Sequence, residues 1–405
     1  MAVNELNFAQ ISAVIKEVAE QSSGQKVLAP VDTSSFTSVA QIALRADRDA
    51  VMNAISNVLA RTIFSIRPYS AKMTGLEMDS FRWGNMMRKL SIADTDWEDD
   101  EAYAYPIFYD AGQTPPDGEG LSIDRWKIKK PNVLQTNFYG QSVYSDHMTI
   151  TEDQLETAFT GPEQLGSFLS LLMTNLSNRL EMSNEAIRRG LVCNAIGALY
   201  DENQTGRVIH LLTEYNTLTG ITPALTAQTV FDPANFPAFC KWVYSRVAEI
   251  TDLFTANSTM FQTNITGKPI LRHTPYEFQR VYLYSPFQRQ MDARVLADTF
   301  HDNYLRYADV ESIPFWQSLD KRDEVLVTPS YVDTTGTLVT PGSAVNVKNI
   351  FGLIFDRDAM GMTILDRRVL STPVNESGLY RNIWVHGKQR VVFDNTEKCC
   401  LLLLD

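Results

Sequence analysis

The sequence predicts an α+β fold on three observations. Leucine and isoleucine residues recur at helical spacing through residues 165–199, and residues 346–405 read mostly as strands. Between these segments, helices and strands follow one another without the strict alternation of a parallel α/β fold. Hydrophobic residues make up 44% of the 405 residues and charged residues 21%, which is typical of a folded globular chain.

Residues 1–62 are predicted to form an N-terminal arm with helical pieces. Phe8, Ile11 and Val18 fall at helical spacing, and residues 39–63 carry a second apolar stripe. The polar residues 22–37 separate the two stripes, so the arm has little local sequence to fold against.

Residues 63–146 are predicted to contain a long hairpin arm. An aromatic strand at 103–109 and a basic strand at 125–129 flank a tip rich in Gly and Pro, AGQTPPDGEG, and the acidic run 94–101 comes before them. Because an isolated two-stranded hairpin is marginal in water, we expect the arm to lie on the rest of the chain or on a neighbouring copy. The expected assembly contacts are Asp94, Asp96, Glu98, Tyr103, Tyr105, Arg125, Trp126, Lys127 and Lys129.

Residues 147–203 are predicted to be helical. Thr151 with Gln154 could cap a short helix, and Thr160 with Glu163 a long one. The long stripe has one polar gap, at residues 183–184. A continuous helix here would be about 60 Å long, which exceeds the usual helix of a compact domain and indicates a spine.

Residues 204–345 form a mixed segment, with helices expected at 234–257 and 292–300 and strands at RVYLYS and EVLVTP. Residues 346–405 are expected to supply the closing strands VKNIFGLIFD, GMTIL, RNIWVHG and RVVFD. The final CCLLLL is apolar enough to be a strand buried in a sheet, with its cysteines acting as small apolar residues.

The net charge of the chain limits the kinds of partner that it can bind. A net charge of −12 and a pI near 5.0 argue against a basic surface that grips nucleic acid, though not against a protein that encloses it. No apolar run approaches the roughly 20 residues of a membrane span, and the N-terminus lacks the basic start of a signal peptide. We therefore expect the chain to be made and folded in a cytoplasm.

No motif of a catalytic, cofactor or metal site is present, and we expect none of these sites. The five histidines are scattered, no Cys/His cluster occurs, and Gly267-Lys268 is followed by Pro269, which breaks the phosphate-loop pattern. The four cysteines are expected to be buried thiols in a reducing compartment.

Two acidic groups have a composition that could suit a functional site. Asp94, Asp96 and Glu98 have the spacing of a calcium loop, but Asp99 stands where Gly is needed and Tyr105 where the bidentate Glu should be. A solvated or partner-facing charge patch is therefore favoured for this run.

Asp356, Asp358 and Asp366 could supply the paired carboxylates of a hydrolase. Their neighbours Arg357, Arg367 and Arg368 favour ordinary ion pairs at strand ends instead.

The order of elements resembles the major capsid protein of tailed bacteriophages, whose fold is known as the Johnson or HK-ninety-seven-type fold. The chain looks most like that of the short-tailed phages related to phi-twenty-nine. The resemblance is carried by TITEDQLETAFTGPEQLGSFLSLLMTNLSNRLE, DARVLADTFHDNYLRYADVESIPFW and the stretch from IFDRDAMGMTIL to the end, which span most of the chain from residue 149 onward. These are patterned helices and strands rather than catalytic signatures.

The resemblance assigns each segment a part of that fold. It implies an N-arm at 1–62, an extended E-loop hairpin region at 63–146, a peripheral domain with the spine helix at 147–203, and an axial domain at 204–345. Residues 346–405 would then be the closing strands of the peripheral and axial domains. Because the sequence ends near the last of these strands, the extra immunoglobulin-like domain of the phi-twenty-nine capsid protein is expected to be absent.

The implied function is structural. Copies would form pentamers and hexamers of an icosahedral phage head around double-stranded DNA, with a scaffolding protein and a portal as partners, no cofactor and no membrane. Assembly would take place in the host bacterial cytoplasm. Two alternatives stay open at this point: another virion protein, such as a decoration or fibre subunit, and a hydrolase using Asp356 and Asp366.

Overall fold

The computed structural model describes residues 71–78, 86–93, 132–139, 142–151, 162–203, 206–267, 270–291, 310–340 and 343–405, together with Lys16, Glu20 and Val39. Those three isolated residues lie in helical backbone, as expected for pieces of the arm. The helix expected at 292–300 lies outside the described residues.

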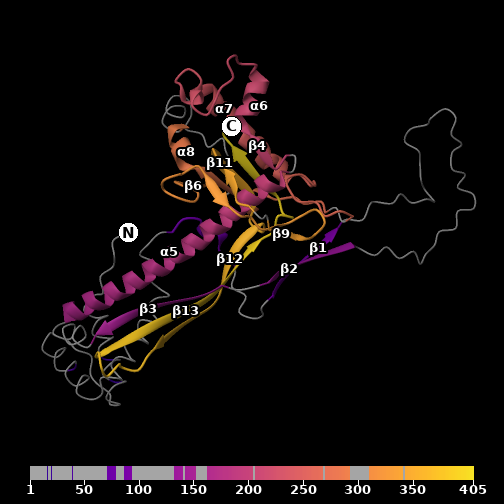
Figure 1. Ribbon diagram of the computed structural model, residues 1–405. Helices are drawn as coiled ribbons and strands as arrows, with labels where there is room; N and C mark the ends of the chain where they lie inside the picture. The colour runs from indigo at the N-terminus through magenta and orange to yellow at the C-terminus, as the bar shows by residue number, and fades with distance from the viewer. Residues whose placement is uncertain are drawn as a thin grey trace, which may run out of the picture.

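One long helix organises the fold. Helix α5 (Pro162–Glu202) is continuous over 41 residues, about 60 Å, and Figure 1 shows it crossing from the long sheet at lower left into the centre of the molecule. Leu176 and Leu180 in its first half pack against Val385. Leu191, Ile196 and Leu199 in its second half belong to a different cluster. The predicted spine is thus confirmed, and it connects two separate sheets.

The first sheet has three antiparallel strands in the order β12–β13–β3. Its strands are long: β3 (Ser142–Thr151), β12 (Met360–Ser371) and β13 (Tyr380–Phe393). Residues 147–151 were expected to begin a helical segment, and that prediction is wrong. They pair with β13, from Trp384↔His147 to Tyr380↔Thr151, and pairing across more than 200 residues overrides the local capping pattern.

The second sheet has five strands in the order β4–β14–β11–β5–β6. These are β4 (Val208–His210), β5 (Gln279–Tyr284), β6 (Val310–Ile313), β11 (Ile350–Asp356) and β14 (Cys399–Leu403). Every residue of β11 and β14 is buried, which confirms the prediction for CCLLLL. All four cysteines are free and buried.

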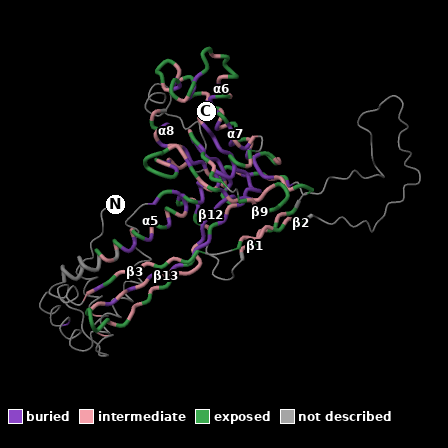
Figure 2. The backbone as a smooth tube through the Cα atoms, in the orientation of Figure 1, coloured by how far each residue is buried: buried purple, intermediate pink, exposed green. Residues whose placement is uncertain are grey.

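Helices cover both faces of this second sheet, as Figures 1 and 2 show. Ile354 and Leu402 point to a cluster that includes residues of α6 (Leu211–Thr219), α7 (Phe236–Thr255) and α8 (Ser285–Met291). Leu353 and Leu401 point to the opposite cluster, with the second half of α5. The alternation along each strand therefore buries the sheet on both sides.

Short elements complete the described chain. The pair β7–β10 (Val325–Val327 and Val345–Val347) lies beside α5, and β8–β9 (Tyr331–Val332 and Leu338–Val339) forms a separate two-stranded sheet. Three 3-10 turns are η1 (Thr74–Leu76), η2 (Thr229–Phe231) and η3 (Tyr276–Phe278). The predicted helix at 234–257 and the strands RVYLYS and EVLVTP are all found as α7, β5 and β7, within a few residues.

Candidate assembly surfaces

All nine expected contact residues, Asp94, Asp96, Glu98, Tyr103, Tyr105, Arg125, Trp126, Lys127 and Lys129, lie outside the described residues. The strands that flank them are described. Strand β1 (Met86–Ala93) pairs antiparallel with β2 (Asn132–Tyr139), and Ala93 is the direct partner of Asn132. Residues 94–131 therefore connect two paired strand ends. We call β1 and β2 the stem.

The two faces of the stem differ in polarity and exposure. Side chains of one face alternate along each strand and meet those of their partners. Leu90 and Ile92 are 61% and 63% exposed, and Val133, the partner of Ile92, lies on the same face. Tyr139 of β2 is also exposed. This face of the stem thus exposes four large apolar side chains, which we call the outer stem face, and it also carries the polar residues Arg88, Gln135 and Asn137.

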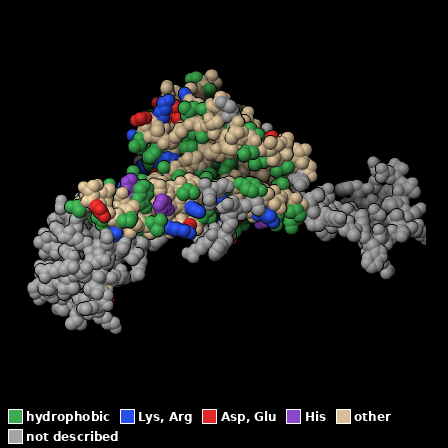
Figure 3. All heavy atoms as spheres, turned by 60° about the horizontal axis from the view of Figure 1, so that its bottom comes forward, with side chains coloured by type: hydrophobic (Ala, Val, Ile, Leu, Met, Phe, Trp, Pro, Cys, Tyr) green, Lys and Arg blue, Asp and Glu red, His purple; other side chains and the backbone are tan. Residues whose placement is uncertain are grey.

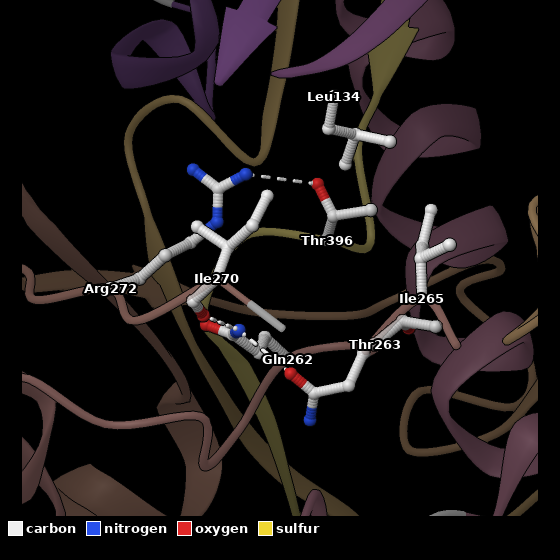
Figure 4. A pocket seen from close by; sticks show the side chains of 8 residues that line it. Leu134, Gln262, Thr263, Ile265, Ile270, Arg272 and Thr396 are labelled. Carbon is white, nitrogen blue, oxygen red and sulfur yellow. Dashed lines mark hydrogen bonds between the residues drawn. The ribbon is translucent and has the colours of Figure 1, made fainter. Parts of the chain in front are cut away.

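The other face of the stem rests on the body of the molecule. Leu134 lies over a narrow hollow formed by residues 262–265, Ile270, Arg272 and Thr396, and Figure 4 shows its side chain directed into that hollow. The hollow is too narrow to hold a water molecule. Arg272 donates to the hydroxyl of Thr396 at 3.3 Å and to that of Ser91 on the stem at 3.2 Å.

A buried ion cluster fixes the stem to the body beside this hollow. The ammonium of Lys89 on β1 donates to Asp394 Oδ2 at 2.7 Å and to Glu397. Arg272 also pairs with Glu397. We call these four residues the stem anchor. Two cations face two carboxylates, and three chain segments meet in one cluster.

The protonation equilibria of the stem anchor reflect this pairing. Burial opposes the charge on Lys89, but Asp394 and Glu397 outweigh it and raise its pKa. Burial likewise disfavours the Asp394 carboxylate, yet Lys89 and the N–H and hydroxyl of Thr396 hold its pKa below the usual range. For Glu397 burial dominates and raises the pKa despite Lys89 and Arg272.

Sequence reasoning missed the stem anchor. Lys89 lies more than 300 residues from Asp394 and Glu397. No local spacing links a lysine to two acids at that separation. The only signal was the lysine's place at an inward position of an alternating strand.

A second buried ion pair fixes the segment before the stem. Arg188 of α5 is fully buried and pairs with Glu77 at 2.5 Å and with Glu181 at 3.7 Å. Its guanidinium also donates to the carbonyl of Lys72 at 3.4 Å. These contacts hold residues 71–78 against the spine helix. Met73 and Leu76 of this segment are buried.

Aromatic and imidazole rings lie close together on the face of the three-stranded sheet that points away from α5. His147 stacks on Trp384 with ring centroids 4.4 Å apart, and His386 lies parallel to Trp384 at 6.0 Å. Trp384 and His386 therefore share a face of the sheet. Figure 3 shows histidine and apolar side chains gathered on the side of the molecule that carries the long sheet.

The carboxylates considered for hydrolysis are not brought together. Asp356 ends β11 in the five-stranded sheet and accepts from the Thr274 hydroxyl at 2.6 Å. Asp366 lies six residues after Met360, the first residue of β12, which is about 20 Å along the strand. Its carboxylate pairs with Arg368 at 2.8 Å. The expected ion pairs are found for Asp366 and, at 3.8 Å, for Asp358 with Arg357.

An open pocket of about 400 Å³ lies near Asp356 and is lined partly by Arg272, Arg357, Asp358 and Glu397. Its charged groups are occupied by one another or by neighbouring residues: Arg272 pairs with Glu397, and Arg357 with Asp358. Within the described ranges, no group of three or more His, Cys, Asp or Glu side chains could hold a metal ion. Among the helices described, none is long and apolar enough to cross a membrane.

Solved structures of similar fold come from phage particles. The chain matches a protein in the capsid of Staphylococcus phage Andhra with a TM-score of 0.51 at 11% identity, covering 84% of this chain and 87% of that one. It matches a chain from the structure of the head fiber and inner core protein gp22 of native bacteriophage P68 with a TM-score of 0.50 at 12% identity, with the same coverages. Identities this low establish the fold alone.

The sequence itself identifies the family. No protein with a curated description matches it significantly. The sequence pattern of one family, described as Phi29-like phage major capsid protein, matches residues 11–403, which is nearly the whole chain. The mixed α+β architecture with its spine helix agrees with this match, as the sequence resemblance implied. The chain therefore belongs to the Phi29-like phage major capsid proteins and is a subunit of a phage head shell.

Proposed function

We propose that copies of this chain form the pentamers and hexamers of an icosahedral head that encloses double-stranded DNA. Assembly takes place in the cytoplasm of the bacterial host, with a scaffolding protein and a portal, and the subunit itself carries out no catalysis. The observation that carries the proposal is the outer stem face, four exposed apolar side chains on a strand pair that the stem anchor holds to the body.

Burial of this face against a neighbouring copy is the physical reason for its composition. Four large apolar side chains on one small strand pair are costly to leave in water, at about 25 cal/mol per Å² of apolar area. An isolated hairpin has no use for such a face, whereas a shell contact does. The acidic balance of the chain fits a shell that encloses DNA without gripping it.

The direct test is assembly of the purified chain with and without its scaffold. Negative-stain images and sedimentation are expected to show capsomers or closed particles. Monomers alone at high concentration, even with scaffold supplied, would contradict the proposal. Small symmetric oligomers that bind only pre-made shells would instead indicate a decoration or fibre subunit.

Charging the outer stem face should stop assembly without unfolding the subunit. In the double variant Leu90→Asp with Ile92→Asp, two carboxylates would have to be desolvated at the contact, and particle yield should fall at least about tenfold. The matched control is Leu90→Met with Ile92→Val, which keeps the face apolar. Normal particles from the charged variant would show that this face is not a contact.

The predicted basic strand at 125–129 offers an independent test. Reversing the charge of Lys127 and Lys129 to Glu should impair assembly and leave the monomer folded, because both lysines are proposed assembly contacts. Sedimentation of the variant with scaffold measures the effect. Wild-type particle yield would remove the basic strand from the set of contacts.

A further inference from the structure

Lys398 is a fully buried lysine, with 0% of its surface exposed. Its ammonium donates to the carbonyl oxygens of Ala256 at 2.7 Å and Phe254 at 3.1 Å, and to the hydroxyl of Ser258 at 3.2 Å. Burial lowers the pKa of this ammonium to about 8. A buried lysine is costly unless its ammonium is hydrogen-bonded, so Lys398 and these oxygens depend on one another.

The oxygens around Lys398 belong to the C-terminal end of helix α7. The last carbonyl groups of a helix have no partner within the helix, and many helices end on a left-handed residue that satisfies them. Helix α7 ends at Thr255, and the next residue, Ala256, has extended backbone instead. Lys398 therefore supplies donors that this helix end lacks, and its charge interacts favourably with the helix dipole.

The turn that carries Lys398 also carries the two acids of the stem anchor. Residues 394–398 connect β13 to β14, and all five are buried. Asp394 and Glu397 pair with Lys89 of the stem, whereas Lys398, the next residue, donates to the end of α7. One short turn thus contacts the stem with its acids and α7 with its lysine.

A second connection links Lys398 to Arg272, the remaining member of the stem anchor. Ser258, which accepts from Lys398, pairs its backbone with that of Arg272 through two N–H to carbonyl bonds, of 3.0 Å and 3.1 Å. The guanidinium of Arg272 donates to Ser91 of the stem at 3.2 Å and pairs with Glu397. Both body segments that hold the stem are therefore joined at Lys398.

We propose that Lys398 is a positioning residue for the stem. It fixes the turn 394–398 and the segment of Arg272 to the end of α7, so that the stem anchor holds the stem in one place on the body. Residues next to a helix end can cap it, whereas this cap comes from the turn that holds the stem. The inference rests on the proposed function for its consequence, which is that the stem so placed presents the outer stem face to a neighbouring copy.

Hydrogen exchange of the full chain without scaffold tests the placement of the stem directly. In Lys398→Met the turn and the end of α7 lose their common contact, so amides of β1 and β2 should exchange at least about tenfold faster than in the wild type. Amides of α5 and β3 should keep their wild-type rates, since Lys398 contacts neither element. Mass spectrometry of peptides from each element measures the rates.

Ser258→Ala is a milder variant that decides the test if Lys398→Met does not fold. It removes one hydroxyl acceptor and leaves the carbonyls of α7 on Lys398, so exchange in the stem should be about threefold faster. The matched control is Asn216→Ala. The side chain of Asn216 ties the end of α6 to Leu225 by hydrogen bonds of 2.8 Å and 2.9 Å, and this helix end shares no residue with the stem anchor.

A double variant separates positioning of the stem from general stabilisation of the fold. In Lys89→Met the stem anchor is already broken, so adding Lys398→Met should speed exchange in the stem by less than about twofold further. A lysine that only stabilised the fold would add its full factor in both backgrounds, because independent effects are additive.

Faster exchange confined to the stem, the turn and the Ser258–Arg272 segment, weaker in Ser258→Ala and nearly lost in the Lys89→Met background, supports the proposal. Unchanged exchange in the stem of the folded variants overturns it, and so does acceleration that spreads equally to α5 and β3 or that follows from Asn216→Ala. These rates are read on single subunits. Failure of the shell proposal would appear separately, in the assembly of the wild-type chain.

Discussion

Replacing Lys89 by Met is expected to lower the free energy of unfolding by about 3 kcal/mol at neutral pH. The change removes one cation from a buried cluster and leaves Asp394 uncompensated, with a side chain only 2% exposed. Glu397 still pairs with Arg272. The loss of unfolding free energy is therefore expected near the lower end of the range for a broken buried ion pair. Urea unfolding of both proteins measures the difference.

The same substitution should also impair particle formation. The stem anchor ties β1 to residues 394–397, so its loss removes the ionic part of the contact that directs the stem. For the unfolding measurement the matched control is Arg88→Met, since Arg88 is the neighbouring cation on the exposed side of the same strand. If both variants unfold at the same urea concentration as the wild type, the stem anchor contributes nothing to stability.

The effect of Lys89→Met should depend on pH in a defined direction. The folded-state pKa of Asp394 is depressed, so its contribution is present above about pH 4, its unfolded value, and is lost as the pH falls through the folded pKa. The pKa of Lys89 is raised, so its contribution is present below about pH 10.5 and is lost as the pH rises through the folded value. The difference between variant and wild type should therefore be full at pH 6–9 and shrink below about pH 4.

Glu397 makes the stability depend on pH in the opposite direction. Its folded-state pKa is raised, so the folded protein binds more protons than the unfolded chain from about pH 4.5 up to the folded value. Keeping this carboxyl ionised costs stability at neutral pH. As the pH falls through the folded value toward 4.5, this cost is relieved in the wild type before the contribution of Asp394 is lost.

The elements that the sequence predicted well are those with a strong local pattern. The stripe from Leu165 to Leu199 marked α5 correctly, although Asn184, in its expected polar gap, is buried. CCLLLL marked β14 because six apolar residues in a row have few uses other than a buried strand. Both elements could be identified without knowledge of their partners.

The elements that were predicted wrongly depend on distant partners. Two strands, RNIWVHG and RVVFD, were expected where β13 runs unbroken from Tyr380 to Phe393. Lys388 and Gln389 lie between the two expected strands. Both residues pair with β3, and the Tyr144 ring lies over Gly387, where no Cβ would fit.

The candidate site shows the same division. The sequence predicts a hairpin whose strands lie outside the described residues, and the strands on either side of it, β1 and β2, are paired with each other. It could not locate the stem anchor or the contacts of Lys398 with α7, because each joins segments that meet only through the tertiary fold. Charged residues without local spacing look alike in a sequence, whether they are solvated or buried.

Gly352→Ala is expected to destabilise the subunit by about 2–3 kcal/mol and to lower the yield of soluble protein. Gly352 lies in β11, the central strand of the five-stranded sheet, between Leu283 and Leu402. An added Cβ would lie 2.9 Å from Leu283 Cδ2 and 2.9 Å from the carbonyl oxygen of Tyr282. The leucine can move, but the carbonyl belongs to the ladder, so the strain remains.

A matched glycine elsewhere should respond in the opposite way. Gly190 lies in α5, is exposed, and has nothing within 4 Å of an added Cβ. Gly190→Ala should therefore stabilise the subunit by up to about 1 kcal/mol, through helix propensity alone. Thermal or urea unfolding of Gly352→Ala and Gly190→Ala beside the wild type measures the expected loss and the expected gain of stability in one experiment.

A double variant distinguishes the two sources of strain at Gly352. Leu283→Val shortens the side chain that the new methyl group meets, so Gly352→Ala with Leu283→Val should recover part of the loss after the cost of Leu283→Val alone is subtracted. Full recovery would mean that the Tyr282 carbonyl is not an obstacle. No recovery would mean that the backbone contact carries the whole effect, and the five-stranded sheet then tolerates only glycine at this position.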